Sequence, residues 1–413
     1  MASFQSESVH APASAMTSTR GDIKHLDYID AVRGLAFLWV LTFHCALCVG
    51  QFPLRWLFLH GVFGVELFFL ASAITLNASW MQRREVDRFP ALAFYVRRFL
   101  RIAPMFWLGM VFYTLLPDVM PHFWLGQFAP NGVRPVYFLA TASFVNGWYP
   151  YSFSSIVPGG WSIAVEMTFY LFCPLCFTLL GTPRRAAAAT VLCLWLSHYF
   201  YDAVPQFLRS HLFPGVQVDG AFLHWGHFWF PTQAPVFMLG FCIYHLLSNP
   251  QVRRLVRDRF LAWTILVACI LALWGFLPGQ THFTPVDFWV VAALAGVVVS
   301  ISGGAVPILV MRPLRYVGIL SYSCYLVHFA ALGLALRLFH IRLSADEPGR
   351  DFGSPVLNFT YFAALCGLTL AATVVVAALT SRRVERPGIE LGRRIVRRLN
   401  RKFPQSSGAV HER

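Results

Sequence analysis

Residues 31–50 read AVRGLAFLWVLTFHCALCVG, and this stretch decides the class of fold. With roughly 20 residues it is long enough to cross a hydrocarbon core about 30 Å thick as a single helix. Its only basic side chains are Arg33 and His44. Similar apolar runs recur as far as Thr380, without the alternation of apolar and polar residues that barrel strands show. The sequence therefore predicts an all-α, polytopic membrane protein.

The composition also indicates that lipid surrounds most of the chain. Of the 413 residues, 57% are hydrophobic and 13% are charged, whereas soluble domains carry about 25% charged residues. The formal net charge is +14, but the arginines lie in short segments between apolar runs, which is typical of orientation in a membrane. We therefore expect a lipid bilayer as a partner and no nucleic acid.

About ten segments are predicted to cross the membrane. They are 31–50, 57–80, 99–117, 161–181, 186–204, 228–247, 260–277, 286–302, 315–339 and 357–380. A shorter apolar stretch, 135–148, is expected to be re-entrant or interfacial. With that assignment, every loop on one side of the membrane is rich in arginine and every loop on the other side is sparse. Because positively charged loops stay inside, both ends of the chain are expected in the cytoplasm.

The chain divides into three parts by composition. These are a disordered cytoplasmic N-terminal segment (1–25), a membrane-embedded domain (26–381) and a basic cytoplasmic tail (382–413). The tail is typical of a basic helix that lies on anionic lipid headgroups. A stop-transfer cluster of positive charges would explain the same pattern.

Nine cysteines lie in or beside the apolar segments. Two pairs, Cys45/Cys48 and Cys173/Cys176, have the CxxC spacing of redox or metal sites. In helices of this kind they are interpreted as small packing residues. No metal site is expected.

Ionisable residues inside the predicted spans are functional candidates, because lipid makes their burial costly. Arg33 and His44 are 11 residues apart, so they share one face of the first helix, with about 16 Å of axial rise between them. The helical rise places Glu66 of the second span and His328 of the ninth span at about the depth of His44. The three titratable groups are therefore expected to face one polar cavity.

Three further charged residues stand near the ends of spans. Arg98 and Arg101 are spaced i, i+3 at the inner end of the third span, so they present one face of guanidinium groups. Such groups match phosphate oxygens, although an ordinary positive-inside cluster would look the same. Glu166 is expected about 8 Å inside the outer end of the fourth span, where it could bind an acceptor hydroxyl or pair with an arginine.

The order of these motifs resembles the acyltransferase 3 family, the integral-membrane O-acyltransferases of bacterial surface sugars. The matching blocks extend from about residue 26 to 390. They are Tyr28-Ile-Asp30-Ala-Val-Arg33-Gly34 with His44, Gly61-Val-Phe-Gly64-Val-Glu66, Arg97-Arg98-Phe-Leu-Arg101, Trp161-Ser162-Ile-Ala-Val-Glu166, Leu320-Ser321-Tyr322-Ser323-Cys-Tyr325-Leu-Val-His328 and Val384-Glu385-Arg386-Pro387.

The resemblance implies a membrane-bound, acyl-CoA-dependent O-acyltransferase in the bacterial inner membrane. It would transfer an acyl group, most often acetyl, from cytoplasmic acyl-CoA to a hydroxyl of a sugar or surface glycan. Acyl-CoA would be a co-substrate, and no tightly bound cofactor is implied. The acceptor, the acyl chain length and the oligomeric state stay open. The residues alone also allow a proton-coupled glycan transporter or flippase, because His and Glu lie at mid-membrane depth.

Roles for the donor side and the reacting groups follow from the resemblance. Arg33, Arg98 and Arg101 are expected to bind the phosphates of the donor. His44 is expected to act as general base for the attacking hydroxyl, or to carry the acyl group transiently. Glu66 would orient its imidazole, as the carboxylate does in a catalytic triad.

The remaining candidates concern the acceptor and the oxyanion. Glu166 is expected to position the acceptor from the outer side of the membrane. The thioester oxygen needs hydrogen-bond donors in the transition state. The candidates are Ser321, Tyr322 and His328.

Overall fold

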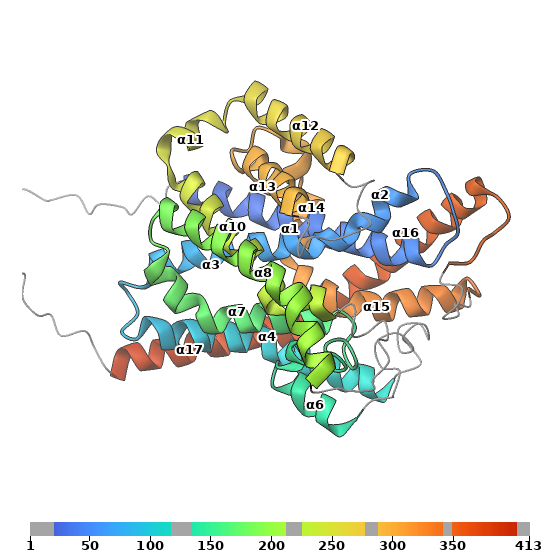
Figure 1. The fold of residues 1–413 in the computed structure, drawn as a ribbon, viewed down its shortest axis with the longest axis horizontal. Coiled ribbons are helices and arrows are strands. Elements are labelled where there is room, and N and C mark those ends of the chain that lie inside the picture. The colour runs from blue at the N-terminus through green and yellow to red at the C-terminus, as the bar shows by residue number, and fades with distance from the viewer. Residues whose placement is uncertain (1–19, 117–133, 212–224, 277–287, 342–348, 403–413) are drawn as a thin grey trace, which may run out of the picture.

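The computed structural model of the protein describes residues 20–116, 134–211, 225–276, 288–341 and 349–402. Within these ranges the chain is helical, and its β-interactions are limited to an isolated parallel bridge between Val49 and Arg350. Most of the long helices run in a broadly common direction and pack side by side (Figure 1). The all-α prediction is therefore confirmed for the described part of the chain.

The helices agree closely with the predicted spans. In chain order they are α1 (Arg20–Leu47), α2 (Arg55–Leu59), η1 (His60–Phe63), α3 (Gly64–Arg83), α4 (Pro90–Leu115), α6 (Pro135–Ala142), η3 (Asn146–Trp148), α7 (Gly160–Leu179), α8 (Pro183–His211), α10 (Phe230–Ser248), α11 (Pro250–Leu255), α12 (Arg259–Phe276), α13 (Phe288–Ser302), η5 (Pro307–Val310), α14 (Arg312–Ile319), α15 (Ser321–Leu338), α16 (Pro355–Thr380), η6 (Ser381–Glu385) and α17 (Arg386–Lys402). Every predicted span overlaps at least one of them. The predicted span 315–339 is divided at Leu320 between α14 and α15.

Six helical segments of the described chain are long and apolar enough to cross a membrane, or seven if the bent pair α13 and α14 forms one span. The six include α1, α3, α7, α10, α15 and α16. Of the other predicted spans, α4 carries arginines in its first half, and α12 is apolar but short. A multi-pass membrane protein is therefore supported, while the count of ten and the cytoplasmic position of both ends stay predictions.

The segment 135–148 forms the eight-residue helix α6 and the short turn η3. A helix of this length extends about 12 Å, which is too short for a hydrocarbon core of about 30 Å. The structure therefore supports the expectation that this segment does not cross.

The N-terminal boundary differs from the expected one. Helix α1 begins at Arg20, within the segment 1–25 that we predicted to be disordered. Residues 1–19 lie outside the described residues, so the prediction for them stands as it was.

Helix α1 packs against α14 at backbone distance. A Cβ atom added to Gly318 would lie 1.7 Å from the carbonyl oxygen of Asp30, and one added to Gly34 would lie 2.1 Å from that of Leu314. Only glycine fits at both positions, because any side chain would overlap the main chain of the other helix. This contact fixes the part of α1 that carries Arg33.

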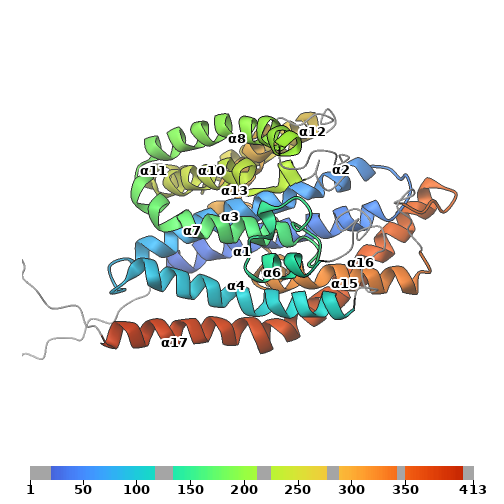
Figure 2. The same ribbon diagram turned by 60° about the horizontal axis from the view of Figure 1, so that its bottom comes forward.

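The predicted basic tail forms α17, which follows α16 through the five-residue π-helical turn η6. Helix α17 runs beside α4 (Figure 2). Gly388 allows the approach, since a Cβ there would lie 2.5 Å from the carbonyl oxygen of Leu100. Near its other end, Asn400 accepts a hydrogen bond from the Arg88 amide and donates one to Asp87. The tail helix therefore packs on protein along one face, and contact of its exposed arginines with lipid headgroups stays a prediction.

Candidate functional site

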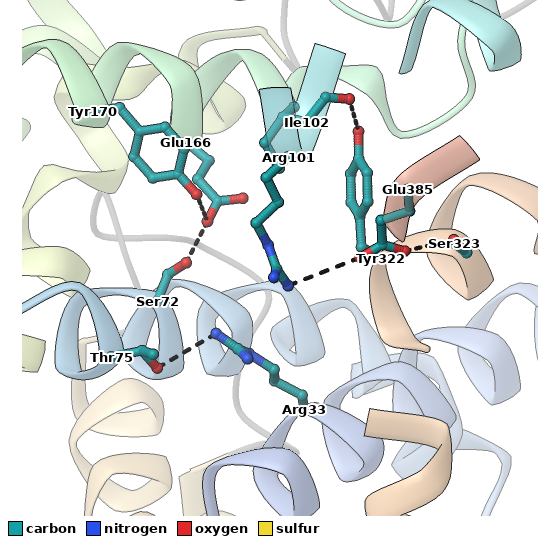
Figure 3. Close-up of polar contacts among 10 residues, drawn as sticks. All are labelled: Arg33, Ser72, Thr75, Arg101, Ile102, Glu166, Tyr170, Tyr322, Ser323 and Glu385. Carbon is teal, nitrogen blue, oxygen red and sulfur yellow. Dashed lines mark hydrogen bonds and ion pairs between the residues drawn. The ribbon is translucent and has the colours of Figure 1, made fainter. Parts of the chain in front are cut away.

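A pocket, which we call the central pocket, lies between α1, α3, α4, α7 and α15. Its polar lining consists of Arg33, Ser72, Arg98, Arg101, Ser162, Glu166, Tyr170, Ser321, Tyr322 and Tyr325. Figure 3 shows several of these side chains converging from different helices. The structure thus brings together the three arginines that the sequence assigned to a donor.

Close helix packing, a hydrogen bond and helical spacing position the three arginines. Arg33 is carried by α1 next to the close contact at Gly34, and its Nη2 donates to Thr75 Oγ1 on α3 at 3.3 Å. Arg98 and Arg101 stand one helical turn apart on α4, so both side chains reach the same side. The result is a concentration of positive charge in the central pocket, contributed by α1 and α4.

Glu166 lies in this same pocket, in the first half of α7, the part of the helix in which the sequence also placed it. Its Oε1 accepts hydrogen bonds from the hydroxyls of Tyr170, at 2.7 Å, and Ser72. Residues 151–159, which lead into α7, are all buried, so the first turns of this helix lie inside the protein and bring Glu166 to the arginines.

A second cavity, which we call the vestibule, lies where α3 ends and α4 begins, with α17 as one wall. It is lined by six arginines, namely Arg83, Arg84, Arg97, Arg98, Arg101 and Arg393. The acidic residue in the lining is Asp87, which forms an ion pair with Arg97. Trp80 and Phe94 add aromatic surface. Because Arg98 and Arg101 line both cavities, the vestibule and the central pocket meet at these two side chains.

His44 and His328 lie together, as expected from their predicted depth. Their ring centroids are 5.1 Å apart, and both rings pack against Phe329. His44 Nδ1 bonds the carbonyl of Val40 at 2.8 Å, and His328 Nδ1 bonds that of Tyr325 at 2.6 Å. Since a carbonyl can only accept, both Nδ1 atoms carry hydrogen, and each neutral ring keeps a lone pair at Nε2.

The histidine pair does not line the central pocket. Tyr325 lies between the central pocket and the histidine pair. It lines the pocket, and its carbonyl accepts the hydrogen bond from His328. Glu66 is buried at the start of α3 and interacts electrostatically with Tyr325. The side chain of His44 is therefore turned into the protein, and the pocket as described ends at Tyr325, short of His44.

Ser321 and Tyr322 both line the central pocket. The Tyr322 hydroxyl donates to the carbonyl of Ile102 at 2.6 Å, so its proton is already engaged. His328 has a lone pair at Nε2 when neutral, and this atom has no hydrogen-bond partner among the described residues. Ser321 meets both requirements for an oxyanion donor. It lines the central pocket, and no described residue accepts a hydrogen bond from its hydroxyl group.

Sequence reasoning missed the partners that hold the charged groups. Tyr170 follows Glu166 by four residues, a spacing that could have indicated the contact. Glu385 is 3% exposed, accepts a hydrogen bond from Ser323 at 2.8 Å, and forms an ion pair with Arg101 at 4.0 Å. The sequence matched its block to a family pattern but gave the residue no role.

No metal-binding cluster of three or more His, Cys, Asp or Glu side chains occurs among the described residues. All nine cysteines are free thiols in the structure.

Comparison with known proteins gives one family and several relatives. The family described as "Acyltransferase domain" matches residues 26–378. The peptidoglycan O-acetyltransferase OatA of Listeria monocytogenes is 24% identical over 396 residues, which cover 90% of this chain and 57% of OatA. YrhL of Bacillus subtilis is 25% identical over 382 residues, covering 88% of this chain and 55% of YrhL.

A third relative is nodulation protein 10 of Rhizobium leguminosarum, which is 24% identical over 294 residues, covering 65% of this chain and 71% of that protein. The chain spans little more than half the length of OatA and YrhL. No solved structure matches the chain.

Proposed function

The chain belongs to the acyltransferase family that matches residues 26–378, and on this premise we propose that it is a membrane-bound O-acyltransferase. It transfers an acyl group, most often acetyl, from cytoplasmic acyl-CoA to a hydroxyl of a sugar or exported glycan on the other side of the bacterial inner membrane. The observation that carries the proposal is the pair of cavities that meet at Arg98 and Arg101.

The vestibule suits the nucleotide end of the donor. Coenzyme A carries three phosphate groups and an adenine ring, and guanidinium groups bind phosphate oxygens in bidentate geometry. Six arginines and two aromatic side chains line the cavity. The pantetheine arm would then pass Arg98 and Arg101 into the central pocket and extend along the face of α1 that leads from Arg33 to His44.

His44 is the proposed general base. Its Nε2 lone pair takes the proton of the acceptor hydroxyl while the hydroxyl oxygen attacks the thioester carbon. The carbon–sulfur bond then breaks, and coenzyme A leaves as a thiolate that takes up the proton held by His44. The Val40 carbonyl, which is bonded to Nδ1, orients the imidazole in place of Glu66, and Ser321 donates to the developing oxyanion. Transient transfer of the acyl group to His44 is the alternative within the same scheme.

The reaction as proposed requires that Tyr325 move, since this side chain separates the central pocket from His44. The aromatic ring is held by hydroxyl contacts, as Ser162 Oγ lies 2.9 Å and the Gly159 carbonyl 3.2 Å from its oxygen. Two neutral hydrogen bonds are worth only about 1–3 kcal/mol together. The ring also packs against Phe68 and His328, so we propose that binding of the donor from the vestibule provides the free energy that displaces it.

The position of Glu166 changes its proposed role. In a scheme where the acceptor arrives from the outer side, the acceptor meets His44 before it could reach the level of Arg33. A carboxylate among arginines is better placed to accept hydrogen bonds from the amide groups of the pantetheine arm. We therefore assign Glu166 to donor positioning rather than to the acceptor.

The acceptor is proposed from the relatives alone. OatA of Listeria monocytogenes is named a peptidoglycan O-acetyltransferase, and a glycan hydroxyl is the corresponding acceptor class for this chain. Ten spanning helices with both ends in the cytoplasm would place the vestibule on the side where acyl-CoA is made.

The test uses purified protein and acetyl-CoA labelled in the acetyl group. Slow loss of label from the thioester that depends on His44 supports an acyltransferase, even without the natural acceptor. Inert thioester, combined with glycan movement in proteoliposomes, would instead favour a proton-coupled transporter or flippase. Comparing the acetyl content of surface glycans with and without the gene then identifies the acceptor class.

A further inference from the structure

Glu385 is a buried carboxylate that the proposed reaction does not use. It belongs to the π-helical turn η6, and only 3% of its surface is exposed. Its Oε2 accepts a hydrogen bond from Ser323 Oγ at 2.8 Å, and its Oε1 lies 4.0 Å from Nη2 of Arg101 (Figure 3). A buried carboxylate is costly without a compensating charge, and Arg101 is the cation that provides it.

Arg101 occupies the junction of the two cavities, because it lines both. A separation of 4.0 Å exceeds hydrogen-bond distance, so Glu385 attracts the guanidinium without occupying its N–H donors. Arg101 makes no hydrogen bond to any other residue in the described part of the chain. Its donors therefore stay available to an anionic ligand while its position is held by charge.

The turn that carries Glu385 is fixed by the packing of α17. Gly388, three residues later, contacts the main chain of α4 at Leu100. At the far end of the helix, Asn400 is hydrogen-bonded to Asp87 and to the Arg88 amide. Glu385 is thus held at a constant place relative to α4, which also carries Arg101.

We propose that Glu385 is a positioning residue for Arg101. It holds the guanidinium at the junction between vestibule and central pocket, so that the phosphate end of a donor meets an arginine that is already oriented. This inference rests on the proposed acyltransferase function. It also assigns the C-terminal helix to the site, because α17 and η6 deliver the carboxylate.

The decisive variant is Glu385→Gln, which keeps the shape of the side chain and an acceptor for Ser323 but removes the charge. The KM for acetyl-CoA is expected to rise about tenfold, equivalent to ~1.4 kcal/mol, while kcat stays within about twofold. Asp27→Asn is the matched control, since that carboxylate also pairs with an arginine, Arg315, at 2.9 Å, and neither side chain lines either cavity. It should leave KM within about twofold, because a partly exposed ion pair contributes little and this one does not reach the donor.

A double-mutant cycle separates positioning from general stabilisation. In an Arg101→Ala background, Glu385→Gln should have no further effect on KM, because the group it positions is absent. Ser323→Ala is a second, milder variant that keeps both charges and removes only the hydrogen bond that orients the carboxylate. Its KM should rise about two- to fivefold, as expected for loss of one hydrogen bond, and it serves if Glu385→Gln does not fold.

Each of these measurements can overturn the positioning role of Glu385. An unchanged KM in folded Glu385→Gln protein, an equal rise in Asp27→Asn, or full additivity with Arg101→Ala would overturn the positioning role while leaving the acyltransferase proposal intact. If Glu385→Gln does not fold, an unchanged KM in Ser323→Ala overturns it. If the parent protein consumes no acetyl-CoA at all, the proposed function fails and this inference fails with it.

Discussion

His44 on α1 and His328 on α15 lie with their imidazole rings 5.1 Å apart. Each ring donates a hydrogen bond from Nδ1 to a backbone carbonyl, and both rings pack against Phe329. The lone pair of each neutral ring is therefore on Nε2, in an aromatic environment. Neutral rings held in this way can accept a proton but cannot donate one to a ligand. This arrangement favours the role of base for His44 and argues against neutral His328 as an oxyanion donor.

Replacing His44 by alanine should lower acetyl transfer by about 10²- to 10⁴-fold, the usual contribution of a general base. Release of coenzyme A thiol from acetyl-CoA measures the rate. His60→Ala is the matched control, because the Nδ1 of His60 bonds the carbonyl four residues earlier, at Trp56, as that of His44 does at Val40. Normal turnover in the folded His44→Ala protein would remove this residue from the mechanism.

Arg98→Ala should weaken coenzyme A binding about 10- to 100-fold, as expected for loss of a charge-assisted hydrogen bond. Calorimetry on detergent-solubilised protein measures the dissociation constant without need of the acceptor. The control is Arg394→Ala, since the Arg394 side chain is 66% exposed on α17 and lines neither cavity. Equal affinities for both variants would return Arg98 to a role in membrane orientation alone.

Tyr170→Phe removes one of the two hydroxyls that hold Glu166. Hydrogen bonds to a charged group contribute about 1.5–3 kcal/mol, so kcat/KM for acetyl-CoA should fall at least about tenfold. Tyr95→Phe tests the same chemical change outside the cavities, because that hydroxyl donates to the Leu171 carbonyl at an exposed site. If both variants behave alike, the contact to Glu166 has no part in donor use.

Gly318→Ala should destabilise the fold by about 1–3 kcal/mol, since the added methyl group overlaps the Asp30 carbonyl and must separate α14 from α1. Coenzyme A affinity should fall with it, because α1 carries Arg33. Gly367→Ala provides the contrast on α16, where a Cβ meets no atom within 4 Å and the helix should gain up to about 1 kcal/mol. Thermal unfolding in detergent compares the two, and equal midpoints would contradict the close contact.

Residues that lie on one helix were placed correctly from the sequence. The spacing of Arg98 and Arg101 predicts a shared face, and both line the same cavities in the structure. The depth of His44 and His328 was also predictable, because each lies in an apolar run whose ends can be read directly. In these cases helical geometry alone determines the answer.

The contacts of Glu166 and the burial of Glu385 could not be predicted in this way. The contacts of Glu166 depend on residues 151–159, a buried segment without regular helix whose path depends on tertiary packing. In the sequence, Glu385 follows an apolar run and has arginines on both sides, so the composition of this segment indicates an exposed tail. Only the docking of α17 on α4 brings its carboxylate inside.

The location of Glu385 has a consequence for biosynthesis. A nascent chain that has released α1 to α15 into the membrane already possesses every arginine of the two cavities except Arg393, but Arg101 still lacks its carboxylate partner. That partner is translated only after α16. Full affinity for the donor should therefore arise only once α17 has packed on α4, and a chain that has not yet reached this stage should bind acyl-CoA about tenfold more weakly.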